Sequence, residues 1–162
     1  MKSIQKQLKL LGVIVAVSLL ALFSITALIM VYLPKLSLEV AKMYTAEAHM
    51  RVPVLIQSEL AMGLFLVICL LGLNVLRLVV KGEMYSNASA KTLLFIALCF
   101  LGIGILQLVF IFYIRSQVGG SITNIYSALI AFGCVAAAAL FTLFNRLTVQ
   151  GMHYKQDSEL TI

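Results

Sequence analysis

A single carboxylate lies deep within the apolar part of this sequence. Glu59 is the only acidic residue within the four predicted membrane spans, in the one over about 54–80. A charged residue at the centre of a membrane helix costs about 2.5–3.5 kcal/mol, so such residues commonly serve a function. Glu59 lies eight residues after Arg51, and Gln107 lies eight residues before Arg115. Each is therefore about 12 Å along a helix from a flanking charge, and we expect both side chains at the same depth.

Three hydroxyl residues fall at comparable levels by the same counting: Ser24, Thr26 and Ser127. We therefore hypothesise a polar layer that these hydroxyls form with Glu59 and Gln107. Such a layer is either a ligand, ion or proton site, or a set of interhelical hydrogen bonds that fixes packing, typically worth about 0.6 kcal/mol each. In a third interpretation Glu59 only reaches up to the outer interface. We favour the two structural interpretations over the functional one.

Four stretches without charge must position these residues, at 10–33, 60–76, 92–114 and 122–145. A helix needs about 17 to 25 apolar residues to cross a bilayer. The chain is 62% hydrophobic and only 11% charged, whereas soluble domains are roughly a quarter charged. The sequence predicts an all-α integral membrane bundle, one domain over 1–162, with spans at about 10–33, 54–80, 92–114 and 122–145 and a tail over 147–162.

The twelve basic residues are distributed unequally between the two ends of the predicted bundle. With both termini cytoplasmic, eight of them lie inside and four outside, as the positive-inside rule favours. The inner residues are Lys2, Lys6, Lys9, Arg77, Lys81, Lys91, Arg146 and Lys155, and the outer ones are Lys35, Lys42, Arg51 and Arg115. The net charge of +6 thus reflects topology and anionic lipid rather than nucleic-acid binding.

The segment between the first two spans has its own pattern. Pro34 follows the first span, and we expect it to end that helix. From Lys35 to Arg51, apolar residues recur at helical spacing, namely Leu36, Val40, Met43 and Met50. This pattern predicts a short amphipathic helix on the outer surface. We favour a helix that simply connects two spans over one that closes as a lid on a ligand.

Residues that commonly hold metals or cofactors are scattered. Cys69, Cys99 and Cys134 fall in three different spans without a CxxC spacing, and His49 and His153 lie outside the spans on opposite sides. We therefore expect no cofactor and no haem held by two intramembrane histidines. The sequence contains no HExxH, GxSxG, P-loop or dinucleotide motif, so we expect no enzymatic activity.

Small residues line one side of the fourth span at spacings of four, three and four: Ser127, Ala131, Cys134 and Ala138. Such a stripe lets another helix approach closely. We favour packing within the bundle, and a homodimer through this span is the alternative.

Two segments resemble a known family. One begins at Pro53-Val-Leu-Ile and includes the inner connection Gly82-Glu-Met-Tyr-Ser86 leading to Lys91-Thr-Leu; the other is the terminus, Met152-His-Tyr-Lys-Gln-Asp-Ser-Glu-Leu-Thr-Ile162. The chain resembles the bacterial four-helix membrane proteins of the domain of unknown function 2975 family. Here Glu59 and a tail poor in acidic residues depart from the family pattern. The resemblance implies a bacterial cytoplasmic membrane location and, as a partner, a helix-turn-helix transcription regulator; it carries over no catalytic residue.

Our leading hypothesis is a small regulatory or interaction protein of unassigned molecular activity. Its cytoplasmic face, made of 81–91 and the tail, would hold a soluble partner such as a DNA-binding regulator at the membrane. The tail is expected to be a free peptide, with candidate contacts at Tyr154, Lys155, Asp157, Glu159, Leu160 and Ile162. The alternatives are a homodimeric exporter or ion-coupled transporter that uses Glu59, and an accessory subunit of a membrane complex.

Overall fold

Four long helices account for nearly all of the chain. The computed structural model describes residues 2–118 and 122–160. Its elements are α1 (Lys2–Met43), the 3-10 helix η1 (Thr45–Met50), α2 (Arg51–Val80), α3 (Asn87–Val118) and α4 (Ile122–Leu160). Each of the four α-helices is long and apolar enough to cross a membrane. The chain is thus an all-α, multi-pass membrane protein, as the uncharged stretches predicted.

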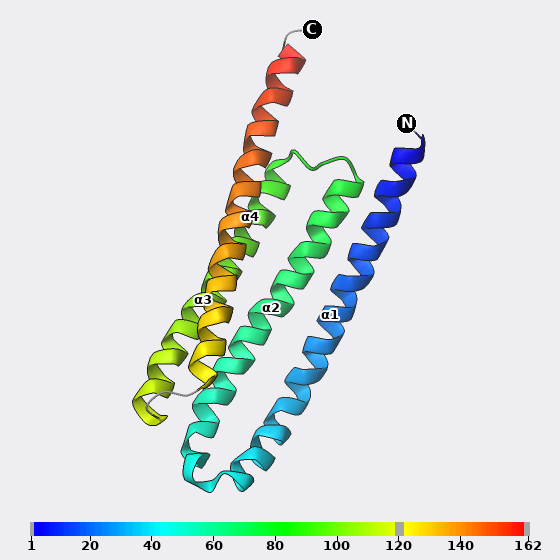
Figure 1. Cartoon of the computed structure of the whole chain (residues 1–162). Coiled ribbons are helices and arrows are strands. Elements are labelled where there is room, and N and C mark those ends of the chain that lie inside the picture. The colour runs from blue at the N-terminus through cyan, green and yellow to red at the C-terminus, as the bar shows by residue number, and fades with distance from the viewer. Residues whose placement is uncertain (1, 119–121, 161–162) are drawn as a thin grey trace.

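The helices pack in series rather than as a closed bundle. They alternate in direction, so the two ends of the chain lie at the same end of the molecule (Figure 1). Within the described residues, α1 packs on α2 and η1, α2 packs on α3, and α3 packs most extensively on α4. The backbone of α1 does not come close to that of α3 or α4 there. The closest backbone approaches therefore join helices that follow one another in the sequence, while side chains of η1 also reach α3.

The core lies mainly between α2, α3 and α4. Its central cluster consists of Ile68, Ile96, Ile103 and Cys134, and the rings of Phe100 and Phe141 stack beside it with centroids 5.7 Å apart. A second cluster lies at the end of the molecule opposite the termini, where Met50 packs against Phe110 and Ile114. Lipid-facing residues such as Phe132 are 76% exposed within the chain, as expected for helices whose outer surface meets hydrocarbon.

The connection between α2 and α3 follows from its residue types. Gly82 adopts a φ of 77°, a left-handed conformation that residues with a Cβ rarely adopt. The Gly82 N–H donates to Val79 O at 3.0 Å, and the Glu83 N–H donates to Leu78 O at 2.9 Å, which is the Schellman pattern for a helix end. Ser86 then caps α3, because its Oγ accepts a bond from Ser89 N–H at 3.2 Å.

The prediction that Pro34 ends the first helix is wrong. Helix α1 continues through Pro34 to Met43, so the expected separate outer helix is divided between the end of α1 and η1. Proline leaves one helical carbonyl without its donor, but membrane helices tolerate proline where other groups satisfy the freed backbone. The carbonyl freed by Pro34 is that of Met30, four residues earlier. The following turn is held by other contacts: Ser37 Oγ donates to Pro34 O at 2.8 Å, and Arg51 Nη2 approaches the same oxygen at 3.5 Å.

The prediction of a free C-terminal tail is also wrong for the described residues. Helix α4 runs without a break from Ile122 to Leu160, so 147–160 extends the fourth span as helix. One face of this extension is packed: Thr148 is only 3% exposed, and the ring of Tyr85 occupies the space where a Cβ on Gly151 would lie. This packing against the α2–α3 connection gives the extension a folded neighbour that a free peptide would lack.

Candidate functional site

The register of α2 against α3 fixes the levels of the polar residues between them. Asn74 Nδ2 donates to Thr92 Oγ1 at 3.3 Å. Ten residues further from the termini on each helix, Leu64 of α2 lies opposite Gly102 of α3: a Cβ on Gly102 would lie 3.4 Å from Leu64 Cδ1. Because the helices are antiparallel, a further five residues bring Glu59 level with Gln107.

The two residues differ in exposure. Gln107 is only 9% exposed, whereas Glu59 is half-buried. Ser127 on α4 is 5% exposed and faces α3, the helix that carries Gln107. Glu59, Gln107 and Ser127 thus belong to the same end of the α2–α3–α4 unit, the end opposite the termini.

The two hydroxyl residues of α1 lie elsewhere. Leu19 of α1 packs opposite Gly72 of α2: a Cβ added at Gly72 would lie 3.3 Å from Leu19 Cδ1. Counting from this pair, Ser24 and Thr26 are level with α2 residues six to eight positions from Glu59, which is roughly 9–12 Å nearer the middle of the helix. Ser24 Oγ donates to the Leu20 carbonyl of its own helix at 2.9 Å. The structure therefore does not bring α1 into one layer with Glu59 and Gln107.

Two polar side chains that were not predicted from the sequence as site residues lie near the level of Glu59 and Gln107. Gln57 Nε2 and Asn124 Oδ1 are buried and have no hydrogen-bond partner. Burying an unpaired amide costs about 1–3 kcal/mol, so these two atoms are unusual polar positions within the helices. The signal was present in the sequence, since Gln57 is two residues from Glu59 and Asn124 is three residues from Ser127.

The small-residue stripe of the fourth span packs inside the chain. Ala131, Cys134 and Ala138 are 3%, 8% and 8% exposed. A Cβ on Gly104 would lie 3.6 Å from both the Ala131 carbonyl oxygen and Cys134 Cβ, so the backbones of α3 and α4 approach closely here. A homodimer through α4 would have to use another face of the helix.

The cysteines and histidines stay apart. All three cysteines are free, with Cys69 and Cys134 buried and Cys99 half-buried on the helix between them. His49 Nε2 lies 3.3 Å from Gln117 Oε1, which ties η1 to the end of α3, whereas His153 lies on the α4 extension. Within the described ranges, no three His, Cys, Asp or Glu residues are grouped as metal ligands would be.

A cleft separates the α2–α3 connection from the α4 extension. We call this cavity of about 650 Å³ the Tyr85 cleft, and its lining is mainly apolar. It is lined by Val75, Val79, Met84, Tyr85, Ser89, Leu93, Phe141, Phe144, Leu147, Thr148, Gln150, Gly151 and Tyr154. The size falls within the range of ligand pockets, roughly 300–1,000 Å³.

Only part of the predicted tail site can be placed. Tyr154 lines the Tyr85 cleft and is 74% exposed, and Lys155 and Asp157 are exposed on the same helix. Glu159 and Leu160 belong to the last turn of α4, but their side chains lie outside the described part, as does Ile162 altogether. The side chains that can be placed thus combine an aromatic ring with charges of both signs.

Comparison with known proteins agrees with the resemblance seen in the connection and the terminus. No curated protein and no solved structure matches the chain significantly. A family model described as "Protein of unknown function (DUF2975)" matches residues 35–162, which include the end of α1 and all of α2, α3 and α4. The chain therefore belongs to the DUF2975 family of proteins of unknown function.

Proposed function

We propose that this protein is a small membrane-anchored interaction protein that holds a soluble cytoplasmic partner, such as a helix-turn-helix transcription regulator, at the membrane. The observation that supports this proposal most is the length of α4. Its 39 residues extend for about 58 Å, while the hydrocarbon core is about 30 Å thick. Arg146 is the first charged residue of α4, so the helix beyond it projects into water.

A rigid projecting helix suits a protein partner better than a free peptide does. Ordering a flexible side chain or segment on binding consumes part of the interaction energy, and a preformed helix avoids much of this cost. The Tyr85 cleft adds a concave, mainly apolar surface beside the helix. Tyr154 is exposed at its edge, and tyrosine is enriched at interaction hot spots.

The cytoplasmic side is assigned by charge. Eight of the twelve basic residues belong to the end of the molecule that carries both termini. Lysine and arginine in short loops and near the ends of spans favour the cytoplasmic side. This charge distribution supports a bacterial cytoplasmic membrane protein with the N-terminus, the α2–α3 connection and the α4 extension inside.

The test is co-purification from native membranes in a mild detergent, with bound proteins identified by mass spectrometry. Removing residues 147–162 would also remove the packed side chain of Thr148, so a surface substitution is sharper. We expect a DNA-binding regulator with the wild-type chain and with Tyr126→Ser, and its loss with Tyr154→Ser. Tyr126 is a matched control, 62% exposed on the same helix near its opposite end. Equal recovery with both variants, or no regulator with the wild type, would contradict the proposal.

A second candidate function is ion-coupled transport or export through Glu59. The observation that favours it is the group of polar side chains near one level, with unpaired buried amide atoms on Gln57 and Asn124. A carboxylate close to such groups could bind a proton or a cation. If the protein is a transporter, Glu59→Gln should abolish the phenotype that the wild-type protein confers on cells, although the variant remains folded. Tyr154→Ser should preserve that phenotype. The opposite pattern would favour the interaction function.

A further inference from the structure

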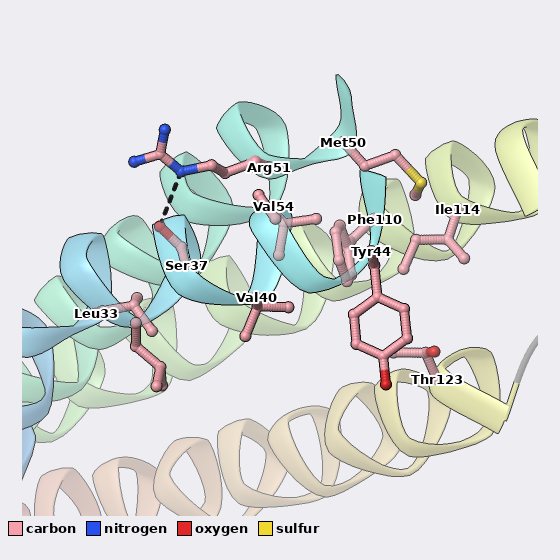
Figure 2. Close-up of a pocket in the computed structure, with 12 residues that line it drawn as sticks. Leu33, Ser37, Val40, Tyr44, Met50, Arg51, Val54, Phe110, Ile114 and Thr123 are labelled. Carbon is pink, nitrogen blue, oxygen red and sulfur yellow. Dashed lines mark hydrogen bonds between the residues drawn. The ribbon is translucent and has the colours of Figure 1, made fainter. Parts of the chain in front are cut away.

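A second cavity lies at the end of the molecule opposite the termini. This cavity, which we call the Arg51 cavity, has a volume of about 480 Å³ and is lined by residues from all four α-helices. Its apolar wall includes Leu33, Val40, Val54, Phe110 and Ile114. Figure 2 shows these side chains around it, with the Tyr44 ring directed toward α4 and Thr123.

Arginine supplies the only charge in the cavity lining. The Nε–H of Arg51 donates to Ser37 Oγ at 3.2 Å (Figure 2), and Nη2 approaches Pro34 O at 3.5 Å. These contacts hold the guanidinium against α1. A guanidinium carries five N–H donors, more than these two contacts use, and its planar fork suits the oxygens of a phosphate. The hydroxyls of Ser37, Tyr44 and Thr123 add polar groups, and none of the lining residues that the structure describes is acidic.

The depth of Arg51 can be judged from the spacing of basic residues along the helices. Lys9 and Lys35 on α1 are 26 residues apart, as are Arg51 and Arg77 on α2. This spacing corresponds to about 39 Å, close to the 40–45 Å thickness of a bilayer with its headgroups. Arg51 therefore lies at headgroup depth, and the apolar wall of the cavity extends from it toward the hydrocarbon.

The cavity also has a side that faces lipid. Leu36, Val40 and Tyr44 of its lining are 56%, 46% and 64% exposed, and the backbones of α1 and α4 do not come close to each other in 2–118 and 122–160. The cavity is thus only partly enclosed, and its exposed lining meets lipid at this depth. A molecule that already resides in the bilayer can enter this way without crossing water.

We propose that the Arg51 cavity binds an anionic glycerophospholipid, with the phosphate at Arg51 and Ser37 and an acyl chain along Val40, Val54 and Phe110. The charge favours this occupant, because the sequence places four basic residues near this level, Lys35, Lys42, Arg51 and Arg115, against two acidic ones, Glu39 and Glu47, and a net positive charge attracts anionic headgroups. The proposal does not depend on the cytoplasmic interaction, which concerns the other end of the molecule.

Native mass spectrometry of the purified full-length chain tests the proposal, with phosphatidylglycerol and phosphatidylcholine of identical acyl chains added at equal concentration. The wild type should retain phosphatidylglycerol preferentially, as a one-to-one complex. Arg51→Gln should weaken that binding by roughly tenfold, and Arg51→Lys should retain part of it. Ala41→Leu, which adds volume to the cavity wall, should reduce retention of both lipids.

Lys42→Gln is the matched control, because Lys42 is an exposed cation one residue from the cavity wall that does not line it. Its binding of phosphatidylglycerol should equal that of the wild type. The proposal is overturned if Lys42→Gln and Arg51→Gln weaken binding equally, since the lipid is then held by general surface charge. It is also overturned if the wild type shows no preference between the lipids, or if inorganic phosphate alone displaces the bound phospholipid. Circular dichroism melting of each variant identifies any that is unfolded, and Arg51→Lys then carries the comparison.

Discussion

The close approach of α3 and α4 at Gly104 and Ala131 gives the sharpest test of the packing. Ala131 is 3% exposed, and its carbonyl oxygen would lie 3.6 Å from a Cβ on Gly104. The Ala131 methyl group is therefore buried where the two backbones approach closely, and the site has little room for an isobutyl group. Ala131→Leu must therefore separate α3 from α4 or force side chains out of their rotamers, and overpacking of this kind costs about 1–3 kcal/mol.

The same substitution on the lipid-facing side provides the control. Ala136 is on the same helix and is exposed. Leucine there meets lipid tails that are as apolar as itself, so Ala136→Leu should change stability by less than about 0.5 kcal/mol. The two variants have identical composition and nearly identical hydropathy along the span.

The assay is reversible unfolding in mixed micelles, in which the fraction of sodium dodecyl sulfate is raised and helicity is followed by circular dichroism. Ala131→Leu should lower the unfolding free energy by about 1–3 kcal/mol relative to wild type. If both variants are equally stable, the α3–α4 contact is not tight, and the reasoning from the small-residue stripe fails. If Ala136→Leu is the more damaging, the assignment of faces on α4 is wrong.

Three further outcomes follow from particular contacts. Gly82→Ala places a Cβ on a residue with a φ of 77° and should destabilise the fold by about 1–2 kcal/mol in the same unfolding assay. Gly133→Ala should not destabilise it, because a Cβ added at Gly133 would have no atom within 4 Å. Asn74→Leu removes an interhelical hydrogen bond and should cost about 0.6 kcal/mol; no loss would mean that the bond contributes nothing. In intact cells, a membrane-impermeant maleimide should label Gln117→Cys but not Gln156→Cys until the cells are opened, and the reverse labelling would invert the proposed topology.

The four helices could be predicted because the length of an uncharged stretch is a local property. Bilayer thickness sets that length, and no knowledge of neighbours is needed to read it. Counting residues from Arg51 and Arg115 also put Glu59 and Gln107 at one level, since the rise per residue is constant. The same counting failed to place Ser24 and Thr26 relative to Glu59, because the offset between α1 and α2 depends on contacts such as that of Leu19 with Gly72.

The two corrections have a common physical cause. Pro34 was expected to end a helix on its intrinsic preference, but the helix continues through it, and Arg51, seventeen residues later, packs on the turn that follows and approaches the Pro34 carbonyl oxygen. The polar tail was expected to be free on its composition, but Tyr85 from a distant connection packs on Gly151. In both cases a partner remote in sequence outweighs local preference, and one sequence alone does not reveal which remote residues meet.

The serial order of packing has a consequence for biogenesis. Because the backbones of the four α-helices approach closely only between neighbours in the chain, most packing can form as soon as the next span enters the membrane. No early span has to wait for a late one, and short sequence separation between contacts favours fast folding. The α1–α2 and α3–α4 hairpins are thus natural halves of the molecule. If the two hairpins are expressed as separate polypeptides divided at the α2–α3 connection, they should reassemble through the interface between them. The divided protein lacks only the covalent link at the connection and keeps the packing between the hairpins.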